Sequence, residues 1–89
     1  MHRPALQIIL DELKKAKLKW PNFLDDPIHA AAILSEESGE LVQAANDFSY
    51  SEGTKEQMIL EAAQSGATAI RFLENIDKYK RIQAYQKGK

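Results

Sequence analysis

The sequence predicts an all-α fold of three helices within one domain. Apolar residues recur at helical spacing in three segments of the 89-residue chain, and two short segments rich in proline, glycine, serine and aspartate separate them. A chain of this size buries only a modest fraction of its surface, so it is marginally stable alone. We expect residues 1–89 to form a single domain, with a core over residues 20–80 and a frayed tail over residues 81–89.

Composition excludes several classes of protein. With 12 basic and 13 acidic residues the net charge is −1, so no strong field attracts the chain to nucleic acid or to an anionic membrane. No apolar run approaches the roughly 18 residues of a membrane span, and the first residues lead into an amphipathic segment instead of a secretory signal. Cysteine is absent, which leaves carboxylates, histidines and amides as metal ligands and favours hard cations such as Mg²⁺. We expect a soluble, cytoplasmic protein.

The first helix is predicted over residues 4–19. Pro4 suits the first turn, where a backbone N–H is not needed. Apolar residues at helical spacing form one stripe: Leu6, Ile9, Leu10, Leu13 and Ala16. Lysines gather near its end, where they complement the helix dipole: Lys14, Lys15, Lys17 and Lys19. They form either a solvated basic face or a basic rim that attracts phosphates.

Residues 20–27 are predicted to connect the first two helices, because two prolines and several Asn and Asp residues break the helical period. Trp20 and Phe23 are large side chains for a connecting segment. One interpretation is that they pack over the end of the helical bundle. The alternative is that they stack on a nucleobase, since an aromatic face stacks on any base.

The second helix should begin with Asp26 as N-cap and Pro27 at its first position, and run to about Asp47 or Phe48. An apolar stripe contains Leu34, Leu41, Ala45 and Phe48, and a polar stripe contains His29, Glu36, Glu40, Gln43 and Asp47. His29 is a candidate ligand, proton shuttle or substrate contact, or an exposed side chain near the helix start. Gly39 inside a helix costs up to about 1 kcal/mol, which close approach of another backbone would justify.

A third helix should follow a loop over residues 49–53. Thr54 and Gln57 match the capping box, so we expect this helix to begin there and to continue to about Lys80 or Tyr85. Between Met58 and Ile76 its formal charges are Glu61, Arg71 and Glu74, and apolar or small residues lie nearly all round it. A helix that is apolar on every side is buried on every side. We therefore expect a homo-dimer or homo-tetramer with this helix at its centre.

Three glutamates are predicted to meet between the second and third helices. Glu37 and Glu40 are one turn apart and share a helix face. Glu61 lies on the apolar third helix, where a carboxylate must be paired, protonated or bound to metal. In an antiparallel hairpin Glu61 would face Glu37 and Glu40, an arrangement typical of a divalent-cation site in a bundle. The alternative is a surface acidic cluster with Glu61 at a crevice.

The spacing of these acids resembles a family signature. Glu36-Glu37-x-x-Glu40 is followed, 21 positions on (61 − 40), by Glu61-x-x-Gln64. This resembles the EExxE motif, then about twenty residues, then ExxD, of the MazG-like all-α nucleoside triphosphate pyrophosphohydrolases. The resemblance covers residues 20–76. It implies a MazG-like helical bundle that hydrolyses an NTP or dNTP to the monophosphate and pyrophosphate with Mg²⁺, or with Mn²⁺ as substitute.

The same resemblance implies site residues. It assigns the metal to Glu37, Glu40 and Glu61, with Glu36 as an accessory catalytic acid. Gln64 stands where the family has an acid. Its amide carbonyl can ligate a hard cation, but it carries no negative charge and cannot act as a base. The alternative is a non-catalytic helical oligomerisation module with a degenerate or structural cation site.

Candidate substrate-binding residues lie outside the motif. The phosphates need cations, which Lys55, Arg71, Lys78 or the lysines of the first helix can supply. Asn75 lies on roughly the same helix face as Glu61 and suits either a substrate contact or a capping role at the edge of the core. Trp20 and His29 complete the substrate-binding candidates. A phosphoribosyl-ATP-type pyrophosphatase, which shares the fold, is a further alternative within the enzyme class.

Overall fold

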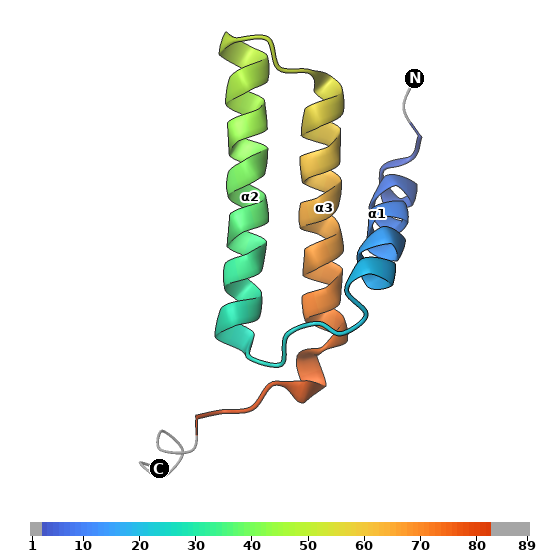
Figure 1. Ribbon diagram of the computed structural model, residues 1–89, viewed down its shortest axis with the longest axis vertical. Helices are drawn as coiled ribbons and strands as arrows, with labels where there is room; N and C mark the ends of the chain where they lie inside the picture. Colours follow the sequence, from blue (N-terminus) through green and yellow to red (C-terminus); the bar gives the residue numbers. More distant parts are fainter. Residues whose placement is uncertain (1–2, 83–89) are drawn as a thin grey trace.

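The computed structural model describes residues 3–82. Three helices, α1 (Ala5–Lys19), α2 (Pro27–Tyr50) and α3 (Lys55–Glu74), are followed by a short 3-10 helix, η1 (Ile76–Lys78), and the described residues contain no strand. In Figure 1, α3 lies between α1 and α2, and both pack against it. The predicted all-α fold of three helices is therefore confirmed.

Local signals place the starts of α2 and α3. Asp26 Oδ1 accepts a hydrogen bond from the Ile28 N–H at 3.0 Å, and Thr54 Oγ1 accepts one from the Gln57 N–H at 3.1 Å. Each satisfies one of the backbone donors that a helix start leaves free. The capping box is only half formed, because the Gln57 amide donates forward to Glu61 Oε2 at 3.2 Å.

The helix ends differ from the predictions. The second helix continues through residues 49 and 50, which we expected in a loop, and ends at Tyr50. The sharp turn that follows brings the Gly53 N–H to the Asp47 carbonyl at 3.0 Å. A Cβ at position 53 would lie 2.7 Å from the Phe48 nitrogen, so only glycine fits this turn.

The third helix is shorter than predicted and ends at Glu74 instead of Lys80 or Tyr85. The backbone N–H of Asn75 donates to the carbonyls of Arg71 and Phe72, at 3.1 and 3.2 Å, and its side chain donates to the Leu24 carbonyl at 3.1 Å. This tie to the α1–α2 connection fixes the end of α3. Residues 81 and 82 have no regular secondary structure; the rest of the predicted tail, residues 83–89, lies outside the described residues.

The core of the single chain is thin. Its buried apolar side chains are Leu13, Ala30, Ala44, Ala63 and Ala67, and no large side chain in residues 3–82 is fully buried. The small residues let the helices approach closely: a Cβ on Gly66 of α3 would lie 3.1 Å from the Ile9 side chain of α1. Many larger apolar side chains therefore stay exposed in one chain.

Exposed apolar side chains occur on every helix, among them Leu6, Leu18, Val42 and Leu73. Among the described residues, no helix combines the length and the apolar character that a membrane span requires.

Candidate metal centre

Carboxylates from α2 and α3 meet at one place in the hairpin. Glu37, Glu40 and Glu61 each present a carboxylate oxygen, and these oxygens lie within 4.8 Å of one another. Ligand oxygens lie about 2.0–2.6 Å from a bound Mg²⁺ or Ca²⁺ ion, so two of them on one ion are up to about 5 Å apart. The three residues, called the carboxylate cluster below, have a geometry that fits one divalent cation.

Two oxygens of the carboxylate cluster are buried without a hydrogen-bond partner, Glu37 Oε2 and Glu61 Oε1. The other oxygen of Glu61 accepts the hydrogen bond from Gln57. Burial raises the pKa of Glu37 above its ordinary value, and the negative charges of Glu40, Glu61 and Glu36 raise it further. A buried acceptor without a partner costs about 1–3 kcal/mol. A cation held between these oxygens would remove both the repulsion and the unsatisfied acceptors.

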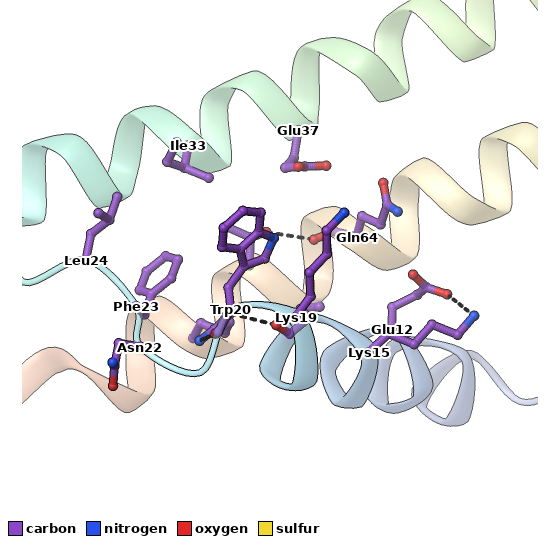
Figure 2. A pocket seen from close by; sticks show the side chains of 14 residues that line it. Glu12, Lys15, Lys19, Trp20, Asn22, Phe23, Leu24, Ile33, Glu37 and Gln64 are labelled. Atoms are coloured by element: carbon purple, nitrogen blue, oxygen red, sulfur yellow. Dashed lines mark hydrogen bonds and ion pairs between the residues drawn. The ribbon is translucent and has the colours of Figure 1, made fainter.

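Gln64 lies one turn after Glu61 and is half-buried. It lines a pocket together with Glu37 of α2, and Figure 2 shows the two side chains facing this pocket from different helices. Gln64 therefore shares this pocket with one member of the carboxylate cluster, Glu37, and the resemblance expects a fourth metal ligand at position 64. The Thr68 hydroxyl, one turn further along α3, donates to the backbone carbonyl of Gln64 at 2.9 Å, and Thr68 lines the same pocket.

This pocket, called the aromatic pocket below, has a volume of about 600 Å³ and lies between α1, the α1–α2 connection and the hairpin. Trp20, Phe23 and Leu24 line it from the connection, and Ile33 and Glu37 line it from α2 (Figure 2). Two lysines of α1 reach it, Lys15 and Lys19. The Lys19 ammonium lies 5.7 Å from the centre of the Trp20 ring, while Lys15 pairs with Glu12 at 3.1 Å.

Two residues predicted to bind substrate, Arg71 and Asn75, instead donate hydrogen bonds to backbone carbonyls of the chain. Arg71 lines the aromatic pocket, but its guanidinium donates to the carbonyls of Ala16 and Trp20. Asn75 is buried, and its side chain donates to the Leu24 carbonyl. Of the two roles that the sequence allowed, this contact fits the capping role at the edge of the core.

Other predicted residues lie apart from this region. His29, Lys55 and Lys78 are exposed, and they belong neither to the carboxylate cluster nor to the lining of the aromatic pocket. Glu36 is also exposed and outside the cluster. Its negative charge nevertheless raises the pKa of Glu37, so it acts on the site through space.

One contact in the site was missed from the sequence. Gln57 was interpreted only as part of a capping box, whereas its side chain orients Glu61. The available signal was the spacing of four residues between Gln57 and Glu61, which places them as neighbours on one helix face.

Comparison with known protein families, with curated proteins and with solved structures finds no match for this chain. The MazG-like resemblance therefore stays a prediction, carried by the motif residues and their spacing.

Proposed function

We propose that this chain is a MazG-like, Mg²⁺-dependent nucleoside triphosphate pyrophosphohydrolase. It cleaves the bond between the α and β phosphates and gives the monophosphate and pyrophosphate. The observation that carries the proposal is the meeting of the two half-motifs: Glu37, Glu40 and Glu61 place their oxygens within 4.8 Å of one another, and Glu37 also lines the aromatic pocket. The spacing of the acids along the sequence is thereby matched by their closeness in space.

The residues present fit a hard cation. Carboxylate oxygens are the preferred ligands of Mg²⁺, and two of those in the cluster are buried without partners. Glu37, Glu40 and Glu61 would hold the ion, and the side-chain carbonyl oxygen of Gln64 would be the fourth ligand. When bound, Mg²⁺ neutralises charge on the phosphate oxygens and lowers the pKa of a coordinated water. Gln57 contributes by holding the Glu61 carboxylate in place.

The aromatic pocket suits the nucleoside. Its volume of about 600 Å³ falls within the roughly 300–1,000 Å³ of small-molecule sites. Trp20 and Phe23 offer aromatic faces for the base, and Leu24 and Ile33 add apolar surface to the lining. Because Glu37 lines the same pocket, a nucleoside bound there directs its phosphates toward the carboxylate cluster. Lys15 and Lys19 add positive charge for the phosphates at the α1 side.

The experiment that tests this function is a pyrophosphate-release assay with the four NTPs and four dNTPs, in Mg²⁺ and in Mn²⁺. We expect release from at least one substrate and none when EDTA removes the metal. We also expect Gln64→Asp to raise the rate, because it restores a negative ligand at the fourth position. No release from any substrate with either ion would contradict the enzyme. It would favour the non-catalytic helical module, which the missing acid at position 64 also allows.

We further propose that the chain works as a homo-dimer or homo-tetramer. The thin core supports this, and so does an exposed and uncharged face along α2, which contains Ile28, Ala32, Ser35, Gly39, Val42 and Asn46. Gly39 lies at the middle of α2, and a Cβ built there meets nothing within 4 Å. A second copy of α2 can approach closely at this point, which explains a glycine that one chain alone does not need.

Light scattering over a range of protein concentrations checks the assembly. We expect an oligomer for the wild type and a shift toward monomer for Gly39→Arg, which places a bulky charge on the uncharged face of α2. Gln43→Arg, on the polar face of the same helix, is the matched control and should leave the mass unchanged. A wild-type monomer at every concentration would contradict the proposal.

A further inference from the structure

Arg71 is the most buried charged side chain in the described part of the chain, with 6% of its surface exposed. No carboxylate of residues 3–82 forms an ion pair with it. A buried charge is expensive unless other groups compensate it. The groups that compensate the charge of Arg71 are therefore neutral.

Two of these groups are backbone carbonyls at the end of α1. One guanidinium nitrogen of Arg71 lies 3.4 Å from the Ala16 carbonyl oxygen, and another donates to the carbonyl of Trp20, the C-cap of the helix. The last carbonyls of a helix carry the negative end of its dipole, which stabilises a cation placed there. The Ala16 carbonyl also accepts the backbone N–H of Trp20, at 2.7 Å. Arg71 thus fixes the point at which the chain leaves α1 and enters the connection.

The third group is the ring of Phe23. The guanidinium carbon lies 5.1 Å from the ring centroid, within the range of a cation–π contact. Only an arginine combines a planar face for this ring with several donors in a fixed fork for the carbonyls. One side chain therefore holds both aromatic residues of the pocket wall, Trp20 through its backbone and Phe23 through its ring.

The rest of the structure holds this wall weakly. Residues 20–26 have no regular secondary structure, and the Trp20 side chain is 62% exposed. The other polar tie from the connection to α3 is the bond between Asn75 and the Leu24 carbonyl, at the far end of the wall. Without Arg71, the bond between Asn75 and the Leu24 carbonyl is the polar tie that remains between this segment and α3, and it holds neither Trp20 nor Phe23.

We propose that Arg71 is a positioning residue that holds Trp20 and Phe23 in place for the base of the nucleotide. Its guanidinium does not bind the phosphates. This inference rests on the proposed function, because it takes the aromatic pocket to be the nucleoside site. Arg71 therefore contributes to base binding and not to phosphate binding, the role that its charge alone suggested.

Two binding measurements separate these roles. Arg71→Met keeps the apolar stem and removes the donors and the charge. We expect it to weaken binding of the α,β-methylene analogues of ATP, GTP, CTP and UTP by about tenfold, the scale of one lost aromatic stack. Binding of inorganic triphosphate in Mg²⁺ should stay within about twofold, because no phosphate contact is lost. An equal loss for both kinds of ligand would overturn the inference.

A third measurement does not depend on any nucleotide. The chain contains one tryptophan, so its fluorescence reports on the pocket wall alone. We expect the anisotropy of Trp20 to fall in Arg71→Met, and to fall less in Arg71→Lys, which keeps a cation without the planar fork. Unchanged anisotropy in Arg71→Met would overturn the inference, even if the wild type bound no nucleotide and the proposed function had failed.

The matched control is Lys17→Met. Lys17 ties α1 to α3 through Glu74 at 3.0 Å, but it is exposed and does not line the aromatic pocket. It should leave the anisotropy and both affinities unchanged. If Lys17→Met has the same effects as Arg71→Met, the loss comes from general loosening of α1, and the specific role of Arg71 is wrong. Should Arg71→Met not fold, Arg71→Lys provides the same comparisons.

Discussion

Glu61→Gln is expected to lower pyrophosphate release by about 10²–10³-fold, the scale of losing one preorganised group that stabilises charge in a transition state. Glu61 is the one member of the carboxylate cluster on α3, so it closes the site from the side opposite Glu37 and Glu40. Glutamine keeps the size of the side chain and can still accept from Gln57, but it removes the negative charge that holds the cation. Steady-state rates of pyrophosphate release, measured at several Mg²⁺ concentrations, check this expectation.

Glu37→Gln should have an effect of the same size, because Glu37 lines the aromatic pocket as well as the cluster. Glu56→Gln is the matched control: Glu56 lies on α3 five residues before Glu61, is exposed, and lies outside the cluster. It should leave the rate within about twofold of the wild type. Raising the Mg²⁺ concentration should restore part of the activity of Glu61→Gln, since a weakened site still fills by mass action. If both Glu37→Gln and Glu61→Gln retain full activity, the reaction does not use this cluster.

The features that follow from local rules could be predicted from the sequence. Asp26 and Thr54 are side-chain caps, and a cap acts within three residues of its position. The meeting of Glu37 and Glu40 with Glu61 needed only helical spacing and one antiparallel turn. That prediction required no knowledge of how α1 packs, which is why the geometry of the cluster matches it.

The features that depend on distant contacts could not be predicted. The third helix ends at Glu74 because Asn75 binds the Leu24 carbonyl, 51 residues away in the sequence. Arg71 looked like a phosphate ligand because the sequence gives its charge but not its two carbonyl acceptors on α1 and the connection. The aromatic pocket likewise forms only where residues 20–24 lie across the hairpin, a tertiary arrangement that no helical period encodes.

Mg²⁺ or Mn²⁺ is expected to raise the melting temperature of the protein by about 10–20 °C. A site filled at 100 times its Kd contributes about 2.7 kcal/mol, and each kcal/mol shifts the melting temperature of a domain this small by about 4–8 °C. The physical origin lies in the cluster itself. Without a cation, three acids lie together and two buried oxygens lack partners, whereas a bound cation makes the same charges attractive. Thermal melts with EDTA and with each ion measure the shift.

The pH dependence of this shift follows from Glu37. Burial and the neighbouring carboxylates raise its pKa in the folded protein above the ordinary value of 4.5. Between these two pKa values the folded state binds more protons than the unfolded state, so the metal-free protein loses stability as pH rises through that window. The cation binds the deprotonated carboxylate, so the shift in melting temperature should be small at or below the ordinary value and grow as pH rises above it.

Glu37→Gln isolates this contribution. An uncharged side chain has no proton to lose, so the metal-free variant should not show the fall in stability with pH that Glu37 causes. At neutral pH it should melt above the metal-free wild type, because it removes a buried charge that three acids repel. In Mg²⁺ the order should reverse, since the wild type gains a bound ion and the variant does not. If Mg²⁺ stabilises Glu37→Gln as much as the wild type, the ion binds elsewhere. A variant that is more stable without metal and inactive with it would identify Glu37 as a residue kept for binding at a cost to folding.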